Sequence, residues 1–506
     1  MAKRIGLWMV LFVLLCAPMA CAQEILPEED GAAFDAPLTL TAQDLKVPEH
    51  TVFPVYSAPF EDAWRGAKGK AAVSVREPVL GLAATRSRNW LMIEYEVTEK
   101  EGRIGWIRIG EEPEAMHFEH LRDWEWDWEE DEEEPGPEPW NALPVLTVSE
   151  LAVTACRTQM TDDPRGGKRT VCTLEEGVRI GRLLTCDLGR NGTWAYIRTE
   201  IDGKPACGFV PSGDVLCVPA VRLEGNVLHV ADGVEFLTGY TQEFMYKGAG
   251  PAGEMASFGM IHAQIDYEQL WAEWDLEEGI GGIVLPDTLR LIGDGAIAEL
   301  AVPELVIPEG VQYLRGFAPF MFCSIGTLRL PSTLADFECG TYFCWIGAYA
   351  VSEENPNLKA EDGVLYSRDG RVLLAYPSAR AALHYDVAKG TKEIHDMAFY
   401  TAPYYDGPGF SPIDLVSLSL PVGLERIGYL AFYNLDNLVS LSIPPTVREM
   451  DEQALGAMAS LSSVSIPPWL AGNASYQNWL EEHGHTGFTG DNGPLAQPES
   501  DEEGVW

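Results

Sequence analysis

The pattern of apolar positions is most regular in the second half of the chain, where one strand-like element recurs. An apolar residue, any residue, an apolar residue and proline follow one another, and neighbouring copies stand 22 or 23 residues apart. The copies are Ile283–Pro286, Leu305–Pro308, Leu328–Pro331, Leu418–Pro421, Leu441–Pro444 and Val464–Pro467. A repeat of this length predicts stacked coils, each of which buries its apolar strand residues against its neighbours.

A second landmark keeps a fixed distance from the first. Eleven residues after the last apolar strand position come Ala296–Ile297, Ala318–Pro319, Ala398–Phe399, Ala431–Phe432 and Ala454–Leu455. We therefore predict a curved solenoid whose strands form one continuous sheet. Irregular coils are expected where Ala388 replaces the proline, where Thr341–Tyr342 replaces the small and bulky pair, and at Tyr400–Ser411, which lengthens one coil.

The first half of the chain carries β-strand patterns of a different kind. Trp90–Val97 and Arg103–Ile109 indicate a hairpin, and Ala71–Val75 indicates a short earlier strand. A second group of strands is predicted between residues 145 and 218, and it ends at Cys207–Pro211. Short strands joined by tight turns predict two small, strongly bent barrels.

Particular residues in both halves resemble known families. Val55–Pro59, Gly69–Ala71 and Gly102–Ile107 are similar to the bacterial Src-homology-3-like family. That resemblance implies a contact surface lined by aromatic residues, with core packing of the same residues as the alternative. The residues concerned are Tyr56, Trp90 and Trp106.

The repeats resemble the BspA-like surface-protein branch of the leucine-rich-repeat family. Ile427–Phe432 and Val351–Leu358 carry this resemblance. It implies an inserted hairpin, for which Asp369–Gly370 is a suitable two-residue turn. After the hairpin, Tyr385–Val387 is expected to resume the ladder of strands.

The start of the chain is typical of an export signal. Lys3 and Arg4 precede an apolar run shorter than the roughly 20 residues that a membrane span needs, and the small residues Ala20–Ala22 follow it. We expect cleavage after residue 22, with lipidation at Cys21 as the alternative. The protein would then be secreted or attached to the cell surface, with no transmembrane segment after cleavage.

These observations predict a multi-domain, mainly β protein. We expect a signal at 1–22, a first Src-homology-3-like barrel with an N-terminal extension at 23–120, an acidic tryptophan-rich linker at 121–142, a second barrel at 143–218, a connector and solenoid cap at 219–278, leucine-rich repeats (an α/β, β-rich solenoid) with an inserted hairpin at 279–468, and a C-terminal cap with an acidic tail at 469–506.

The charge balance excludes some partners. The chain has 35 basic and 77 acidic side chains, a formal net charge of −42. Nucleic acids and anionic lipid surfaces are bound by basic patches, so this chain would repel them. Proteins, neutral glycans or cell-wall material remain as partners, and solubility alone is the simpler interpretation of the charge.

The sequence offers no arrangement for catalysis that its motifs would reveal. It has no nucleophile elbow, no phosphate-binding glycine loop and no His-Glu-x-x-His zinc motif. His117 and His120 could share a helix face, but isolated pairs of this kind are mostly surface residues. Cys156 and Cys207 would need a histidine base, and their module contains none. We expect no enzyme activity, no cofactor and no metal site.

The function predicted is non-catalytic binding of a protein, glycan or cell-wall ligand through the repeat surface. The alternative is an accessory role in a cell-wall-modifying system, with peptidoglycan bound by the barrels. The expected contact surface combines outward strand residues with the Tyr400–Ser411 insertion. Its candidate residues are Arg329, Asp386, Ser419, Ser442, Ser465, Tyr404 and Tyr405.

Overall fold

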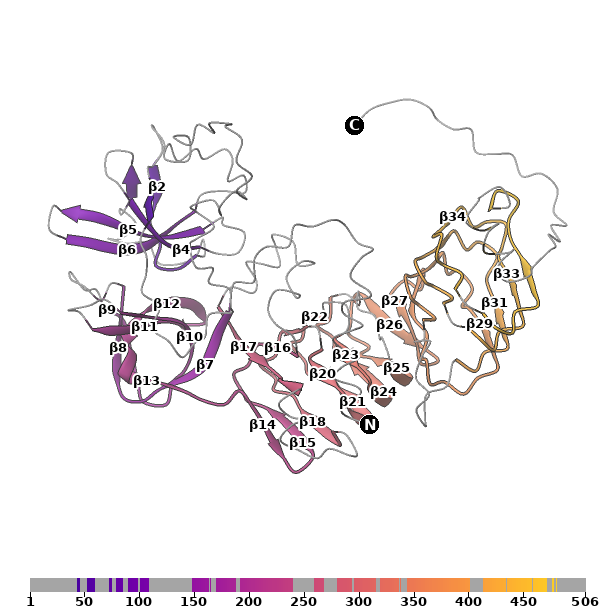
Figure 1. The fold of residues 1–506 in the computed structure, drawn as a ribbon, viewed down its shortest axis with the longest axis horizontal. Helices are drawn as coiled ribbons and strands as arrows, with labels where there is room; N and C mark the ends of the chain where they lie inside the picture. Colours follow the sequence, from indigo (N-terminus) through magenta and orange to yellow (C-terminus); the bar gives the residue numbers. More distant parts are fainter. Residues whose placement is uncertain are drawn as a thin grey trace, which may run out of the picture. The chain divides into compact units, whose positions relative to one another are not determined.

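Figure 1 shows a computed structural model of the chain, which divides into two compact units. The first unit comprises Met1–Glu277 with Val284–Leu289, and the second comprises Glu278–Ile283 with Arg290–Trp506. The described residues are 43–45, 52–59, 72–74, 79–84, 90–98, 101–108, 148–162, 164, 170–187, 192–239, 259–267, 280–293, 295–314, 319–335, 337, 344–400, 413–433, 435–456, 458–470, 476 and 479. The expected signal, the acidic linker and the histidine pair 117 and 120 lie outside these residues.

The first unit begins with a four-stranded antiparallel sheet in the order β1-β4-β5-β6. Its strands are β1 (Gln43–Leu45), β4 (Val79–Ala84), β5 (Trp90–Thr98) and β6 (Glu101–Arg108), and β2 (Val52–Pro54) pairs separately with β3 (Ala72–Ser74). β5 and β6 form the hairpin that the alternating sequence predicts, with Trp90 opposite Arg108. An isolated bridge joins Tyr56 to Trp106, so the segment after β2 packs beside this sheet.

A second sheet follows in the same unit, and its strands between residues 148 and 217 pair antiparallel with one another, while β17 (Met260–Gln264) pairs in parallel with the first of them. Its strands are β7 (Val148–Thr154), β8 (Thr158–Thr161), β9 (Thr170–Leu174), β10 (Arg179–Asp187), β11 (Thr193–Ile201), β12 (Lys204–Pro211) and β13 (Val215–Cys217). β7, β10, β11, β12, β8 and β9 are neighbours in that order, and β13 pairs with the other edge of β7. Close strand packing requires glycine at Gly208, where a Cβ would stand 2.6 Å from the Met160 side chain.

The described residues between 219 and 267, where a connector and cap are expected, form several strands. The hairpin of β14 (Val221–Glu224) and β15 (Val227–Val230) leads into β16 (Phe236–Thr238), which pairs in parallel with β17 (Met260–Gln264). Between β15 and β16, the N–H of Val234 donates to the carbonyl of Ala231 at 3.2 Å. Thr288 accepts from the N–H of Gly233 at 3.0 Å and donates to the carbonyl of Val234 at 2.8 Å.

The same turn recurs in the repeats of the second unit. The N–H of Val311 donates to the carbonyl of Pro308 at 3.2 Å. Thr333 accepts from Gly310 at 2.9 Å and donates to the carbonyl of Val311 at 2.8 Å. Residues 227–239 therefore have the local structure of a repeat coil, although alanine stands at the proline position.

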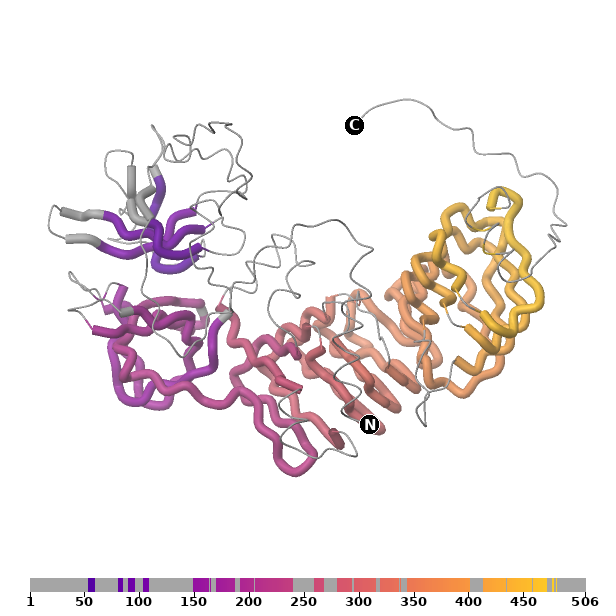
Figure 2. The backbone as a smooth tube through the Cα atoms, viewed as in Figure 1, coloured from indigo at the N-terminus to yellow at the C-terminus, as the bar shows by residue number. Residues whose placement is uncertain are grey.

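The repeats of the second unit stack their strands in parallel (Figure 2). One ladder contains β21 (Ala301–Val306), β24 (Ser324–Leu330) and β25 (Trp345–Val351), and the other contains β29 (His384–Asp386), β31 (Ser417–Ser419), β33 (Ser440–Ser442) and β35 (Ser463–Ser465). The expectation of one continuous sheet is wrong for the described strands. Residues 352–383, which follow β25, hold an insertion, and the ladder starts again at β29.

Shorter parallel pairs form at a second position of each coil. In the later coils these are β30 (Glu393–Ile394), β32 (Arg426–Ile427) and β34 (Glu449–Met450), joined to β28 (Val372–Ala375) of the insertion. In the earlier coils, β19 (Leu291–Ile292) pairs with β22 (Tyr313–Leu314), and β20 (Ile297–Ala298) pairs with β23 (Phe320–Met321). Each coil thus joins its neighbour along more than one line of backbone hydrogen bonds.

The coil that lacks its proline is regular. The N–H of Thr391 donates to the carbonyl of Ala388 at 3.2 Å, as the N–H of Leu424 donates to the carbonyl of Pro421 at 3.2 Å. This turn uses the carbonyl of the proline position and not its nitrogen, so alanine can replace proline there. The irregularity expected at Ala388 is therefore not observed, while Thr341–Tyr342 lies outside the described residues.

The insertion forms the expected hairpin, but with different turns. β26 (Leu358–Glu361) and β27 (Val364–Ser367) are joined by Asp362 and Gly363, both with positive φ, 51° and 76°. This is the two-residue turn that matches the twist of a hairpin. The turn from β27 to β28 is longer, because the N–H of Gly370 donates to the carbonyl of Ser367 at 2.8 Å and Gly370 itself follows with φ 74°.

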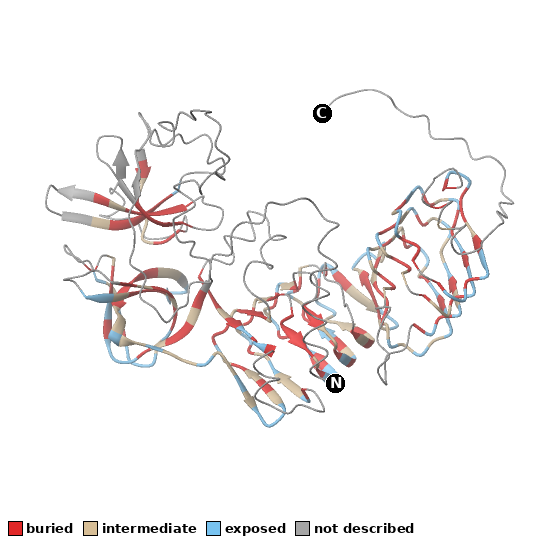
Figure 3. Cartoon of the chain, viewed as in Figure 1, coloured by how far each residue is buried: buried red, intermediate tan, exposed pale blue. Residues whose placement is uncertain are grey.

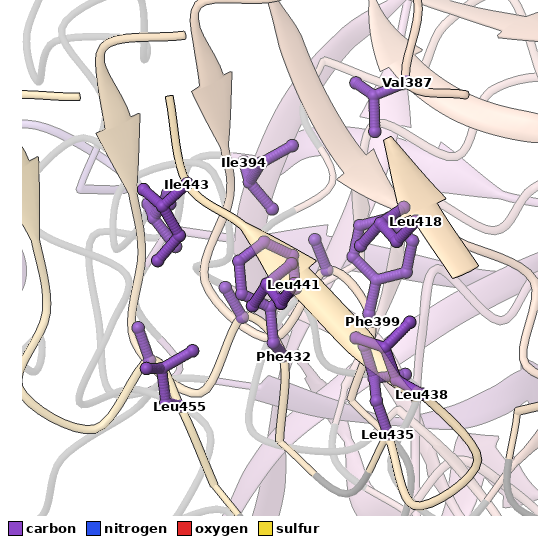
Figure 4. Packing of buried hydrophobic residues seen from close by; sticks show 14 of the residues in the cluster. Val387, Ile394, Phe399, Leu418, Phe432, Leu435, Leu438, Leu441, Ile443 and Leu455 are labelled. Carbon is purple, nitrogen blue, oxygen red and sulfur yellow. The ribbon is translucent and has the colours of Figure 1, made fainter. Parts of the chain in front are cut away.

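The core of the later coils lies between their strands and the pairs of alanine and a bulky residue that follow eleven residues later, such as Ala431–Phe432. Figure 4 shows Phe399 and Phe432 among the leucines of neighbouring coils, and their ring centroids are 5.7 Å apart. The middle strand residues Leu418, Leu441 and Val464 are buried in the same cluster. Figure 3 shows this interior as buried segments lining each coil. Burial of such side chains stabilises the stack by about 1.5–3 kcal/mol each.

Candidate binding surface

The outward side chains of β29, β31, β33 and β35 form a polar surface, which we call the strand face. Successive side chains of a strand alternate between its two faces, so the buried middle residue leaves its two neighbours pointing away from the core. The strand face consists of His384, Asp386, Ser417, Ser419, Ser440, Ser442, Ser463 and Ser465. Parallel pairing arranges them in two rows, one beginning at His384 and the other at Asp386.

The β29 end of the strand face has a fixed line of hydrogen bonds. The Ser417 hydroxyl lies 2.6 Å from Nδ1 of His384, and Oδ1 of Asp386 lies 3.1 Å from Nε2 of the same ring. Hydrogen bonds from Ser419 and then from His384 lower the pKa of Asp386. The carboxylate therefore remains charged at neutral pH and orients the imidazole.

Serine, histidine and aspartate in line are also the parts of a nucleophilic triad, so their surroundings matter. The side chains of His384 and Asp386 are 53% and 73% exposed. Acyl transfer needs fixed donors where negative charge develops, but the nearby N–H of Val387 already donates to the carbonyl of Ser419 at 3.0 Å. This geometry favours a hydrogen-bonding anchor over a hydrolytic centre.

Exposed apolar side chains flank the strand face on both sides. Before the strands, Leu383, Val416 and Val439 are 68%, 39% and 42% exposed. They occupy matching positions, because the N–H of Val416 donates to the carbonyl of Leu383 at 2.9 Å and that of Val439 donates to Val416 at 3.0 Å. In the turns after the strands, Val422 is 89% and Trp469 is 46% exposed.

The predicted residues Asp386, Ser419, Ser442 and Ser465 lie together on the strand face. Arg329 does not join them, because it belongs to β24 in the other ladder, where it donates to Glu304 at 2.6 Å. Tyr404 and Tyr405 lie outside the described residues. The neighbouring Tyr400 stacks on Tyr433 at 5.7 Å between ring centroids, so this side chain packs on the next coil.

The prediction missed the other half of the strand face, which includes His384 and Ser417. The signal was present in the sequence. A residue that precedes the first apolar strand position by one is also outward, since the period of a strand is two.

Two of the three aromatic residues proposed for the barrel surface lie in the interior of the first unit. Trp90 and Trp106 are each 1% exposed, and the half-buried Tyr56 meets Trp90 edge to face at 5.1 Å. Trp90 and Trp106 belong to one core cluster with Tyr196 and Phe209 of the second sheet. These two tryptophans are therefore not part of an exposed surface, because the two sheets pack them against each other.

A buried polar contact fixes that packing. Nε1 of Trp106 donates to the hydroxyl of Tyr196 at 2.8 Å, and this hydroxyl donates to the carbonyl of Ser57 at 3.1 Å. Burial raises the pKa of Tyr196 well above its usual value, so the hydroxyl stays a donor. The two sheets thus share one satisfied hydrogen-bond network as well as an apolar core.

The candidate thiols are held in their unreactive form. Burial raises the pKa of Cys207 to about 12, although Arg198 opposes the shift. The exposed Cys156 has a raised pKa, chiefly because of its hydrogen bond with Asp214. The negative charge of Asp214 raises the pKa further. A nucleophilic cysteine needs a lowered pKa, so neither has the required environment.

One buried histidine should make the folding stability of the first unit depend on pH. His262 lies in β17 with its ring 4.9 Å from that of Phe236, and its Nε2 has no hydrogen-bond partner among the described residues. Burial lowers the pKa of His262 to about 4. Between this value and the unfolded pKa of about 6.5, the unfolded chain binds more protons, so stability falls as pH falls through this range.

We expect His262→Phe to reduce this acid sensitivity. The phenyl ring keeps contact with Phe236 and carries no proton. Relative to the wild type, the variant should gain up to about 1.4 kcal/mol per pH unit as pH falls from 6.5 to 4. Hydrogen exchange of the β7 and β17 amides across this range measures the effect. Parallel stability curves for the two proteins would show that His262 is not the titrating group.

A search of protein families adds a match in the second half of the chain. Residues 277–346 and 409–477 match the family described as BspA type Leucine rich repeat region, in six copies. The coils in these two segments are therefore similar to leucine-rich repeats of the BspA type. Proteins with such repeats are typically secreted or exposed at the cell surface and generally bind other molecules. The coil at His384–Asp386 falls between the matched segments, yet it pairs with the leucine-rich repeat that follows.

Solved structures with local similarity include leucine-rich-repeat proteins. The pneumococcal vaccine antigen PcpA is 18% identical, with 49% of this chain and 79% of that chain covered and a TM-score of 0.26. A leucine-rich repeat protein from Eubacterium ventriosum is 14% identical, with 49% and 83% covered and a TM-score of 0.27. A leucine rich cell surface protein from Faecalibacterium prausnitzii is 20% identical, with 37% and 48% covered and a TM-score of 0.22. No curated protein matches the chain.

The described residues contain no helix of the length and hydrophobicity needed to cross a membrane. They also contain no group of three or more histidine, cysteine or acidic side chains placed to hold a metal ion.

Proposed function

We propose that this protein is a secreted or cell-surface recognition protein that binds its ligand, without catalysis, through the strand face of its leucine-rich repeats. In this proposal the coils form one curved solenoid, and the N-terminal sheets are Src-homology-3-like barrels that support it. The observation that carries the proposal is the set of exposed apolar side chains beside the strand face.

Exposed apolar rows are unfavourable for a soluble chain unless they serve an interaction. Leu383, Val416 and Val439 stand in three successive coils, beside rows of hydroxyl groups that can donate and accept hydrogen bonds. An apolar strip next to a polar strip is the composition of a recognition surface. The core of the same coils is formed by other side chains, such as Leu418, Leu441 and Val464, whereas these three are exposed.

The N-terminal sheets are weaker candidates for the contact. Their largest aromatic side chains, Trp90 and Trp106, fill the core that the two sheets share. A ligand could reach them only if the sheets separated. This disfavours the alternative in which the barrels bind peptidoglycan through these aromatic residues.

A substitution on the strand face tests the proposal. The full chain, the Ser442→Glu variant and the Ser460→Glu variant are compared for binding to peptidoglycan sacculi, extracellular-matrix proteins and a glycan array. Ser442 lies in the centre of the strand face, whereas Ser460 is exposed elsewhere in the coils. A buried carboxylate in the contact should weaken binding at least about tenfold for Ser442→Glu.

The Ser460→Glu protein should bind like the wild type, since it carries the same added charge outside the contact. Equal binding by all three proteins would place the contact elsewhere and overturn the proposal. Circular dichroism of the variants confirms that neither change alters the fold, as expected for exposed positions.

A further inference from the structure

The strand face is almost uncharged, in contrast to the chain as a whole. The chain has a formal net charge of −42. Six of the eight side chains of the strand face are serines, and its one carboxylate, Asp386, is paired with His384 at 3.1 Å. The eight residues of the strand face include no lysine or arginine, and Lys389 is the basic side chain that acts on Asp386 from outside it. Acidic polymers would therefore mainly meet the repulsion of the whole chain. The charge pattern therefore selects a neutral ligand.

From this pattern we propose that the strand face binds a neutral polysaccharide that runs across the coils, an inference that rests on the proposed function. The rows repeat at the spacing of parallel strands, about 4.8 Å. Ser440 faces Ser463, and Ser442 faces Ser465, so the coils of β31, β33 and β35 present the same pair of hydroxyl groups, whereas the coil of β29 presents His384 and Asp386. A ligand with repeated hydroxyl groups can use such a row along its length, whereas a single small molecule would use one or two coils.

The apolar side chains that flank the strand face complement the apolar face of a sugar ring. A pyranose ring has polar edges and an apolar face of C–H groups, and it stacks well on aliphatic and aromatic side chains. Trp469 is 46% exposed in the turn after β35, and its Nε1 donates to the carbonyl of Val447 at 2.7 Å. Because this bond fixes the indole, its exposed surface is available at little entropic cost. Val422, 89% exposed, stands in the equivalent turn two coils earlier.

A protein partner would call for a different surface. Hot spots of protein interfaces are enriched in tryptophan, tyrosine and arginine near the centre of the contact. On the strand face the central residues are serines, and the exposed Trp469 lies at one edge. Many weak, repeated contacts suit a polymer better than a compact epitope.

The test uses the full chain with three insoluble neutral polysaccharides, namely microcrystalline cellulose, β-1,3-glucan and starch granules. Cross-linked polygalacturonate serves as the acidic polymer. We expect saturable binding to at least one neutral polysaccharide, little dependence on salt, and no binding to polygalacturonate. Ser442→Glu and Trp469→Ala should each weaken binding at least about tenfold. The matched controls Ser460→Glu and Tyr429→Ala should retain it.

A second arm, with immobilised extracellular-matrix proteins, separates the outcomes. Preference for polygalacturonate, or neutral binding that neither Ser442→Glu nor Trp469→Ala weakens, would overturn the polysaccharide proposal. If only a protein is bound, and Ser442→Glu abolishes that binding, the polysaccharide proposal fails and the strand face remains the recognition surface. Absence of binding in both arms would overturn both proposals.

Discussion

Phe432→Ala is expected to destabilise the leucine-rich repeats by about 3–5 kcal/mol. Phe432 is fully buried, and its ring lies 5.7 Å from that of Phe399 in the preceding coil. Removing the ring leaves a cavity that touches two interfaces, and coils that are unstable alone depend on those interfaces. Hydrogen exchange of the amides in β31 and β33 measures the loss in the full chain.

The matched control is Tyr429→Ala, three residues earlier in the same coil. Tyr429 is 37% exposed, so its truncation should cost about 1 kcal/mol, clearly less than that of Phe432. A similar loss of stability in both variants would mean that the stacking of the coils does not depend on Phe432. A loss confined to the coil of Phe432 would contradict the dependence of neighbouring coils on one another.

The second large effect is expected in the first unit, where Trp106→Ala should cost about 3–5 kcal/mol. The indole packs between the two sheets and donates to Tyr196 at 2.8 Å. Its removal leaves a large cavity and takes away the donor that the Tyr196 hydroxyl accepts from. Exchange should therefore accelerate in β10 and β11 as well as in β5 and β6, because both sheets contribute to the cluster.

A double-mutant cycle isolates the buried contact. Trp106→Phe keeps an aromatic ring but removes the donor, and Tyr196→Phe removes the acceptor. We expect a coupling free energy of about 0.5–3 kcal/mol between the two changes. Additive effects would mean that the two sheets are held together by apolar packing alone.

The strands and turns of the repeats could be predicted from sequence because each depends on local chemistry. The proline turn is one example, but the irregularity predicted at Ala388 is wrong, because the bond uses a carbonyl that every residue has. The coil at 227–239 is not predicted, because the sequence pattern requires proline and Ala231 stands at that position of the turn. The turn is identified by the bond from Val234 to Ala231 and by the hydrogen bonds of Thr288 with Gly233 and Val234.

Other features depend on contacts between distant residues, which periodicity does not report. The burial of Trp106 results from packing against Tyr196, 90 positions away. An aromatic residue in a small sheet has the same pattern whether it faces a ligand or a neighbouring sheet. The position of Arg329 in a separate ladder likewise depends on where the insertion interrupts strand pairing.

Side-chain footprinting of the full chain, free and bound to its ligand from the binding panel, tests the location of the contact most directly. Hydroxyl radicals label exposed aliphatic and aromatic side chains, and the strand face is flanked by several. We expect protection of Leu383, Val416, Val439 and Trp469, with labelling of Leu216 in the first unit unchanged. Protection confined to residues 148–217, with the flanking side chains of the strand face still labelled, would contradict this expectation.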